Sequence, residues 1–383
     1  MKKMKTVNFG IIGCGVASSF HILGIKKDPN PNIKFTSAFD INEKNLIRLA
    51  KRNKLTPFSD LDDFLSSDIE AVLLLVPHYL HAELTEKVAE AGKHVLCEKP
   101  MACTLEECDR MIKATKKANV KFMIAENHMF LPVHKYIKNL LEKDFIGDVF
   151  LVRTYEGAYC DSQEFLDPNW WHFTFDKGGG GVVMDQGVHK FAMLNWFLGD
   201  VESAQCWCSK TLNSPSNKGE DTAIILLRYK LGAIASIVLS STTVHPLNNS
   251  TELQGTKGTL YEDHSWKNPL KIFSSHPEAE KKGEFYKPSE PIEHGPYPQY
   301  YTISARYEDH HFADCILNDK EPEFTPQQAK KAVAVALLSY LSAKNGNSTS
   351  MDELEIIAKS QKTNEILNDF LPVIQKNYNH LNW

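Results

Sequence analysis

A glycine-containing turn near the start of the chain joins an apolar segment to a stretch with helical spacing. Residues 7–12, VNFGII, are predicted to form a buried strand, and FHILGIKK at 20–27 continues as a helix. In a dinucleotide-binding unit, the first glycine permits a tight turn and the second lets the backbone approach a pyrophosphate at the helix N-terminus. The third position, normally Gly or Ala, is Ser18. The turn residues expected to contact a dinucleotide are Gly13, Cys14, Gly15, Val16 and Ala17.

An acidic residue ends the second predicted strand, IKFTSAFD at 33–40. A carboxylate at this position binds the ribose hydroxyls of NAD and would repel the 2′-phosphate of NADP. The alternative is that Asp40 caps the helix that begins near Asn42, although Asn42 can cap that helix itself. No arginine directly follows Asp40. NAD is therefore favoured over NADP as the cofactor.

Strands and helices alternate through the first third of the chain. Apolar segments at 68–77, 93–100 and 120–127 are separated by helical patterns at 81–92 and 104–119. This alternation predicts a doubly wound parallel sheet of the Rossmann type, with ligands bound at the carboxyl ends of the strands. The residues predicted at those ends are Pro77, His78, Glu98, Lys99, Asn127 and His128.

From about residue 128 the pattern changes to consecutive strands. The predicted strand segments are 147–157, 204–212, 221–230, 233–244, 250–263 and 270–275. Strands that follow one another without helices between them indicate a C-terminal α+β domain with a large, mainly antiparallel open sheet. We therefore expect a NAD-binding domain at 1–127 and a substrate-binding and oligomerisation domain at 128–383. Residues 276–300 are predicted to form a long loop, and 325–346 and 350–371 two helices.

The segment GGGGVVMDQGVHK, residues 178–190, places Asp185 and His189 four residues apart. That spacing would put both side chains on one helix face. Histidine accepts and returns protons near neutral pH, as the oxidation of a secondary alcohol requires, and a lysine such as Lys99 could stabilise the developing alkoxide. Taken singly, each residue has a structural explanation. Asp185 could interact favourably with the dipole at a helix N-terminus, His189 could be a partly buried, hydrogen-bonded helix histidine, and Lys99 could be a surface lysine at a strand end.

Several motifs together resemble the glucose–fructose oxidoreductase / inositol dehydrogenase / MocA (Gfo/Idh/MocA) family. They are FGIIGCG, the spacing from Pro77 to His81, AGKHVLCEKPMA and GGGGVVMDQGVH, with later likenesses in GEDTAIILLRY, LQGTKGTLYED and YEDHHFADCI. The resemblance implies that His189 is the acid/base, Lys99 its partner, and Asp185 a substrate-binding and orienting group. It also implies a homodimer or homotetramer formed through the C-terminal sheet. His81 is added to the expected cofactor-binding residues by the same resemblance.

The chain departs from the family pattern at four positions. Ala192 stands where many members have Asp, His78 where Asn is frequent, and His172 and His128 where Arg is common. These changes concern expected cofactor and substrate contacts. The residues expected to bind substrate are Lys99, Asn127, Tyr155, Trp171, His172, Asp185 and His189.

Composition excludes several other classes of protein. A net charge of −5 and a pI near 6.3 argue against nucleic-acid binding. The longest apolar run, Ala332–Leu338, is far too short to span a membrane. The eight cysteines and 15 histidines show no metal-ligand spacing, so no metal site is expected, and a reduced cytoplasmic protein is the simplest interpretation.

The predicted function is therefore that of a NAD-dependent oxidoreductase acting on a secondary alcohol of a sugar, a polyol (inositol-like) or a sugar derivative. Within enzymes, the alternative is a glycoside-cleaving enzyme that oxidises its substrate transiently with bound NAD. A non-catalytic NAD(P)-binding regulator of the same fold is a third reading, but Lys99, Asp185 and His189 argue against it.

Overall fold

The computed structural model describes residues 6–30, 32–157, 171–210, 219–242, 249–264, 269–360 and 362–368. By compactness the chain forms two units. Unit 1 comprises Met1–Ala102, Glu106–Phe130 and Tyr301–Lys330, and unit 2 comprises Cys103–Leu105, Leu131–Tyr300 and Lys331–Trp383. Residues 301–330 thus pack with the first sheet although they follow the second sheet in sequence. The predicted functional division at 127/128 stays a prediction.

Unit 1 is built on a six-stranded parallel sheet of order β3-β2-β1-β4-β5-β6. The strands are β1 (Val7–Ile12), β2 (Ile33–Phe39), β3 (Thr56–Phe58), β4 (Ala71–Leu74), β5 (His94–Glu98) and β6 (Phe122–Ala125). The strand order reverses between β1 and β4, which creates the crevice where ligands bind in such sheets. The predicted doubly wound parallel sheet is confirmed.

Helices connect these strands in the predicted places. They are α1 (Val16–Lys27), α2 (Glu43–Asn53), α3 (Leu61–Leu65), the 3₁₀ turn η1 (His78–Leu80), α4 (His81–Glu90), α5 (Leu105–Ala118) and the 3₁₀ turn η2 (Asn127–Phe130). Asn42 caps α2, because its side chain accepts a hydrogen bond from the Asn45 N–H. Asp40 is therefore not needed as the cap of this helix.

Unit 2 contains a nine-stranded sheet of order β14-β13-β12-β11-β7-β10-β9-β8-β15. The strands are β7 (Val149–Gly157), β8 (Val201–Ser209), β9 (Thr222–Tyr229), β10 (Ile234–Ser240), β11 (Ser250–Gly255), β12 (Gly258–Asp263), β13 (Leu270–Ser274), β14 (Phe285–Tyr286) and β15 (Thr349–Ser350). β7 and β10 pair in parallel, and the other pairs in the described sheet are antiparallel. The predicted large, mainly antiparallel sheet is confirmed.

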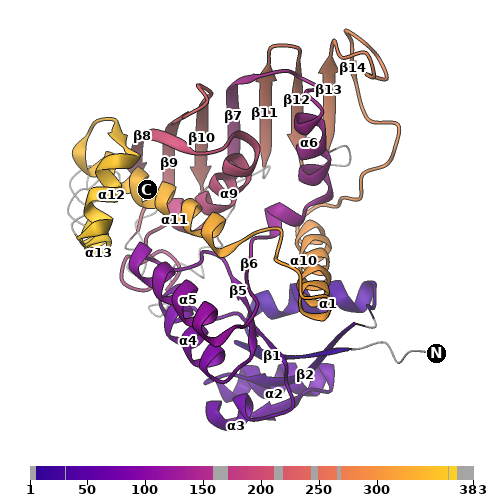
Figure 1. Cartoon of the computed structure of the whole chain (residues 1–383), viewed down its shortest axis with the longest axis vertical. Helices are drawn as coiled ribbons and strands as arrows, with labels where there is room; N and C mark the ends of the chain where they lie inside the picture. Colours follow the sequence, from indigo (N-terminus) through magenta and orange to yellow (C-terminus); the bar gives the residue numbers. More distant parts are fainter. Residues whose placement is uncertain are drawn as a thin grey trace. The chain divides into compact units, whose positions relative to one another are not determined.

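The two faces of this sheet differ in burial. Along β9, Ala223, Ile225 and Leu227 are buried, whereas Ile224 and Leu226 on the opposite face are exposed. The helices α6 (Pro132–Glu142), α8 (Val182–Asp185) and α9 (Gly187–Leu198) belong to the same unit. Figure 1 shows α9 lying over one face of the strands. We call the face that α9 covers the inner face and the opposite face the outer face.

The last part of the chain is helical. The helices are α10 (Gln299–Leu317), α11 (Pro326–Asn345), α12 (Met351–Lys359) and α13 (Thr363–Asn368). The predicted helix at 325–346 is confirmed, whereas the predicted helix at 350–371 is divided into α12 and α13, and its last residues lie outside the described chain. The predicted loop at 276–300 contains the two-residue strand β14. None of the helices in the described part combines the length and the apolar character that a membrane crossing needs.

Candidate active site

The glycine turn after β1 has two glycines with different physical roles. Gly13 has φ +95°, and a Cβ there would lie 2.1 Å from the Leu75 carbonyl oxygen at the end of the neighbouring strand. Gly15 has φ −76°, and a Cβ there would meet no described atom within 4 Å. Gly13 is therefore needed for the fold of the turn, whereas Gly15 keeps space open above it.

Gly15 is also the N-cap of α1, and no described side chain caps that helix. Uncapped N–H groups and the dipole of a helix N-terminus favour an anionic group such as a pyrophosphate. Ser18 fits the third fingerprint position because its buried hydroxyl donates a hydrogen bond to the Gly15 carbonyl oxygen at 2.7 Å. The hydroxyl is thus satisfied within the turn.

Asp40 lies beside this turn. One carboxylate oxygen accepts the Cys14 N–H at 2.6 Å, and the other accepts the Asn42 N–H at 2.7 Å. A carboxylate has about four lone-pair sites, so two remain for ribose hydroxyls. Burial and Asp40 raise the pKa of the Cys14 thiol to about 12, so the thiol stays neutral. The flanking side chains Val16 and Ile41 are 74% and 92% exposed, which leaves apolar surface beside the site. These features fit a dinucleotide.

Glu98, at the end of β5, is held by groups that the sequence did not single out. Its Oε1 lies 3.4 Å from Nε2 of His21, its Oε2 accepts the Lys99 N–H at 2.9 Å, and Nδ1 of His21 lies 2.9 Å from Asp309. Burial alone would lower the pKa of His21, but Asp309, Glu98 and Glu308 raise it well above its ordinary value. Burial opposes ionisation of Glu98, but His21 and Lys99 hold its pKa below the ordinary value. Glu98 therefore holds the backbone N–H of Lys99, and its cofactor contact stays a prediction.

His81 has a similar positioning role. It is fully buried, and its ring nitrogens lie 2.8 Å from the Pro100 carbonyl oxygen and 2.9 Å from that of Val76. Burial lowers its pKa, although the carbonyl oxygens oppose the shift. The ring thus ties the segment after β4 to the segment after β5, and its cofactor contact stays a prediction.

The remaining predicted residues of unit 1 also follow strand ends. Pro77 and His78 follow β4, and the His78 ring is buried with its centroid 5.7 Å from that of His81. Lys99 is half-buried directly after β5. Asn127 is buried two residues after the end of β6, where its side-chain amide donates to Ser304 at 3.2 Å.

In unit 2, close contacts with other residues require glycine at positions in the run 178–181. A Cβ at Gly181 would lie 1.8 Å from the Glu220 carbonyl oxygen, and one at Gly180 would lie 1.9 Å from the Tyr340 hydroxyl. The Glu220 carboxyl accepts hydrogen bonds from the N–H groups of Gly181 and Val183 and from the Tyr340 hydroxyl, at 2.7 to 3.1 Å. Burial raises the pKa of Glu220 to about 7, and these donors only partly oppose the shift. Glu220 and Tyr340 therefore fix the bend that precedes Asp185.

The helix predicted after the glycine run is interrupted. α8 ends at Asp185, and α9 begins at Gly187 with His189 in its first turn. A Cβ at Gly187 would lie 3.0 Å from Leu239 of β10 and from Phe191, so the close approach to the sheet favours glycine at a cost in helix propensity. Asp185 and His189 thus lie on consecutive helical turns and not in one continuous helix.

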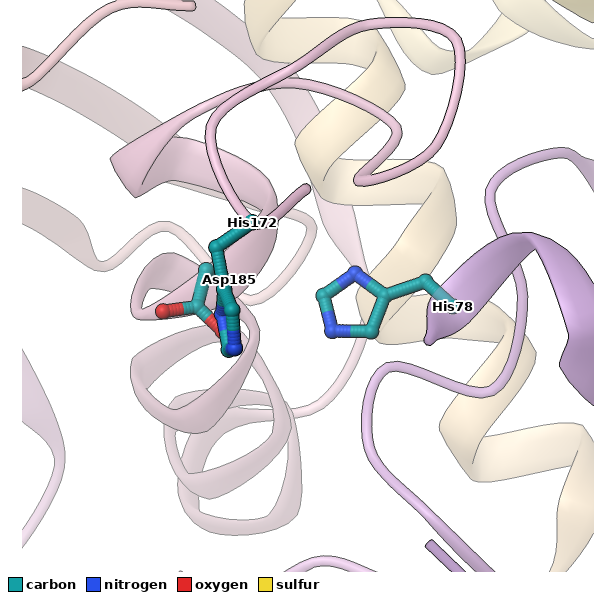
Figure 2. A group of neighbouring side chains, drawn as sticks. All are labelled: His78, His172 and Asp185. Atoms are coloured by element: carbon teal, nitrogen blue, oxygen red, sulfur yellow. The ribbon is translucent and has the colours of Figure 1, made fainter. Parts of the chain in front are cut away.

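His172 lies beside Asp185 (Figure 2), with its Nδ1 3.7 Å from Oδ1 of the carboxylate. The Trp171 ring stacks on the His172 ring, and the ring centroids are 3.9 Å apart. The side chains of His172 and Asp185 are 32% and 16% exposed, so both are accessible. The structure therefore brings together three of the predicted substrate-binding residues of this unit.

Tyr155 does not join them. It pairs with Val238 of β10 and lies on the outer face, because successive side chains of a strand alternate and Glu156 is on the inner face with α9. The substrate contact of Tyr155 stays a prediction, although its side chain lies on the face of β7 opposite to Glu156.

One buried cluster of metal-ligand residue types lies within unit 2. Ligand-type atoms of His134, Glu262 and His264 lie within 4.8 Å of one another. His264 is hydrogen-bonded to Glu262 at 2.7 Å, and His134 lies 3.5 Å from the same carboxylate oxygen. These are contacts of a hydrogen-bonded ion-pair cluster, and we assign it no metal.

Comparisons with known proteins identify the same two parts of the chain. Residues 7–126 match a model described as "Oxidoreductase family, NAD-binding Rossmann fold" of the GFO_IDH_MocA family, and residues 134–261 match its "GFO/IDH/MocA C-terminal domain". The two models together span well over half of the chain.

Individual relatives agree with this result. The uncharacterized oxidoreductase YrbE of Bacillus subtilis (strain 168) is 28% identical over 92% of this chain and 99% of its own length. The myo-inositol 2-dehydrogenase of Thermotoga maritima is 28% identical over 67% of this chain and 75% of its own length. Among solved structures, the WlbA dehydrogenase from Bordetella pertussis, in complex with NADH and UDP-GlcNAcA, superposes with a TM-score of 0.77 at 26% identity over 91% of this chain and 99% of that one.

The Glu220 carboxyl predicts a pH dependence of stability. Its folded pKa of about 7 lies above its ordinary value, so its stabilising contribution is complete below about pH 4.5 and is lost as the pH rises through 7. Glu220→Gln, which resembles the protonated form, should lack this loss. We expect the variant to gain up to about 3 kcal/mol relative to the parent between pH 5 and pH 8, measured by denaturant unfolding at each pH.

Glu202→Gln is the matched control, because Glu202 is an exposed glutamate of β8 in the same unit. It should follow the parent at every pH. A constant difference between Glu220→Gln and the parent from pH 5 to pH 8 would show that Glu220 is not protonated in the folded protein near neutrality.

Proposed function

Because this chain belongs to the Gfo/Idh/MocA family of NAD-binding oxidoreductases, we propose that it interconverts a secondary alcohol and a ketone on a sugar, a polyol or a sugar derivative. The observation that carries the proposal is the fixed bend before α8. It places Asp185 beside His172 and begins α9 two residues before His189, so a carboxylate and imidazoles suited to alcohol chemistry share one region of unit 2.

The cofactor-binding part of the proposal rests on the turn after β1. The residues proposed to hold NAD there are Gly13 to Ala17 and Asp40, with Pro77, His78, Lys99 and Asn127 at the neighbouring strand ends. The charge of Asp40 and its two remaining lone-pair sites support ribose hydroxyls over a 2′-phosphate. When bound, NAD supplies the hydride acceptor of the oxidation.

The proton chemistry is assigned to side chains of this chain. We assign His189 as the base that takes the proton from the alcohol oxygen and returns it in the reverse direction. Lys99, whose backbone N–H is held by Glu98, places an ammonium group to stabilise the alkoxide. Asp185 and His172 bind substrate hydroxyls, and the Trp171 ring offers a flat apolar face for a sugar ring.

The substrate class is supported by the relatives and by the chemistry of these groups. The myo-inositol 2-dehydrogenase acts, by its name, on a cyclic polyol, and the WlbA structure contains a sugar derivative. Paired hydrogen-bonding groups such as His172 and Asp185 suit a molecule with several hydroxyls. Transient oxidation in a glycoside-cleaving reaction would use the same groups and is distinguished by the failure to release NADH.

We also propose that the outer face of the nine-stranded sheet forms the contact between subunits. Trp207 of β8 and Ile224 of β9 are directly paired and are 55% and 46% exposed, and Leu226 and Ile234 on the same face are 38% and 44% exposed. A contiguous apolar surface of this kind marks an interaction site in a soluble protein. A second copy of the same face is the occupant that symmetry favours.

We expect the protein to catalyse the reduction of NAD by cyclic polyols, aldoses or sugar derivatives, which is measured as the absorbance of the reduced nicotinamide. His189→Ala should lower kcat/KM by about 10²–10⁴-fold, the usual contribution of a general base. Lys99→Met should lower kcat by about 10²–10³-fold through loss of alkoxide stabilisation. His294→Ala, in the loop at 276–300, is the control and should retain activity. Parent activity that survives His189→Ala would contradict the assigned base.

The two turn glycines predict separable effects on stability and on cofactor binding. Gly13→Ala should destabilise the protein by about 2–4 kcal/mol, because a positive φ and the clash with Leu75 both oppose a Cβ. Gly15→Ala should keep the thermal midpoint of the free protein but bind NAD at least about tenfold more weakly, because its Cβ enters the space for the cofactor. Calorimetry measures both quantities. Equal NAD affinity in Gly15→Ala and the parent would place the cofactor elsewhere.

If the outer face forms the subunit contact, charged side chains introduced there should dissociate the oligomer into monomers. The double substitution Ile224→Glu and Leu226→Glu should convert a dimer or tetramer to a monomer at micromolar concentration, measured by light scattering after size exclusion. Ile356→Glu is the control, since Ile356 is 67% exposed on the helix α12 and is not a residue of the sheet. A parent protein that is monomeric at all concentrations would refute the proposal.

A further inference from the structure

A chain of contacts within unit 1 ends at the backbone of Lys99. The Lys99 N–H donates to Oε2 of Glu98 at 2.9 Å, and the other oxygen of that carboxylate, Oε1, lies 3.4 Å from Nε2 of His21. Nδ1 of the same imidazole ring lies 2.9 Å from Oδ1 of Asp309. The contacts therefore run from Asp309 on α10 through His21 on α1 to Glu98 at the end of β5.

Most of this chain of contacts is closed to water. The side chains of His21 and Asp309 are each 2% exposed, and the side chain of Glu98 is 23% exposed. Buried ionisable groups are costly unless they are paired. Hydrogen bonds between charged groups are also stronger where the local dielectric constant is low. His21 and Asp309 therefore hold Glu98 more firmly than surrounding water could.

His21 can hold two carboxylates at once because its ring is charged. Burial alone would lower its pKa, but Asp309, Glu98 and Glu308 raise it well above the ordinary value. A protonated imidazole donates from both ring nitrogens, whereas a neutral one donates from only one. Glu308 lies 4.0 Å from Nε2 of His21, and burial raises the pKa of Glu308 well above its ordinary value although His21 opposes the shift. Glu308 is therefore neutral and does not compete with Glu98 for the ring.

Close packing of α1 against α10 brings the two ends of the chain of contacts together. A Cβ at Gly24 of α1 would lie 2.7 Å from the Thr302 carbonyl oxygen of α10, so glycine permits the close approach of the two helices. Figure 1 shows α10 beside α1. Residues 301–330 follow the nine-stranded sheet in sequence but belong to unit 1. This return of the chain to the first sheet is what brings Asp309 to His21.

We propose that Asp309 and His21 are positioning residues for Lys99. They hold the carboxylate of Glu98, which holds the backbone N–H of Lys99, and the backbone determines where the Lys99 side chain begins. The inference rests on the proposed function of Lys99, which is to stabilise the alkoxide. It extends that function to two residues that, in this proposal, touch neither substrate nor cofactor.

The proposal predicts that a change at Asp309 affects kcat only through Lys99. Asp309→Asn should lower kcat for alcohol oxidation by about tenfold, since a misplacement on the order of 1 Å can cost about 10²-fold in rate. KM and the Kd for NAD should stay within about twofold of the parent, because the alkoxide develops only during the reaction. In a Lys99→Met background, Asp309→Asn should change kcat by less than about twofold, because the ammonium group that it positions is gone.

A purely structural link between the helices gives a different pattern. Asp309→Asn would then lower kcat by the same factor in both backgrounds, and that result overturns the proposal. Asp314→Asn is the matched control, because Asp314 lies on the same helix and pairs with the exposed Lys320 at 2.9 Å. It should leave kcat unchanged. Thermal midpoints identify loss of folding, and if Asp309→Asn does not fold, His21→Gln takes its place in the same comparison.

A second measurement, made without turnover, separates this proposal from the proposed function. Hydrogen–deuterium exchange of the Lys99 N–H, resolved by mass spectrometry with peptide fragmentation, should be about tenfold faster in Asp309→Asn and unchanged in Asp314→Asn. Faster exchange confined to Lys99, together with an inactive parent enzyme, would support the positioning contacts and refute the function. An active parent with unchanged exchange at Lys99 would support the function and refute the positioning role. Faster exchange along the whole of β5 would indicate general loosening and would also overturn the proposal.

Discussion

The contact between Gly181 and Glu220 is the constraint on which the site in unit 2 depends. The backbone of Gly181 lies so close to the Glu220 backbone that a residue with a Cβ would not fit there. The Glu220 carboxyl also accepts hydrogen bonds from the N–H groups at the start of α8. Because α8 is a single short turn, its start determines the position of Asp185 at its end. Gly180 and Gly181 are thus explained by their close approach to Tyr340 of α11 and to Glu220, and their conformational cost is offset by hydrogen bonds to the Glu220 carboxyl.

Local patterns were sufficient to predict the sheets and the two glycine-rich bends. The strand, turn and helix around Gly13 are contiguous, and the alternation of elements fixes a parallel sheet without knowledge of long-range contacts. The partners of those bends were not predictable in the same way. Tyr340 is 159 residues from Gly181, and Asp309 is 288 residues from His21, so neither appears in a local pattern.

Long-range packing adds detail that the local patterns lack. The two-residue period of β7 puts Tyr155 on the face opposite to Glu156, which its residue type does not reveal. The predicted helix after the glycine run is divided into α8 and α9, and the first residue of α9, Gly187, lies too close to Leu239 of β10 for a larger side chain. His81 and Glu98 belong to the predicted strand-end region, yet their polar atoms already bind protein groups. A residue near a site is therefore often part of its support.

The same physical device supports the chemical group in each unit. In unit 1 the buried His21 and Glu98 pair acts on Lys99, which is the next residue after Glu98. In unit 2 the buried Lys190 lies 2.9 Å from Glu156, and it is the residue after His189. In both units an ion pair therefore adjoins a residue that we propose takes part in the reaction. Because the side chains of Lys190 and Glu156 are 0% and 6% exposed, water screens that pair only weakly.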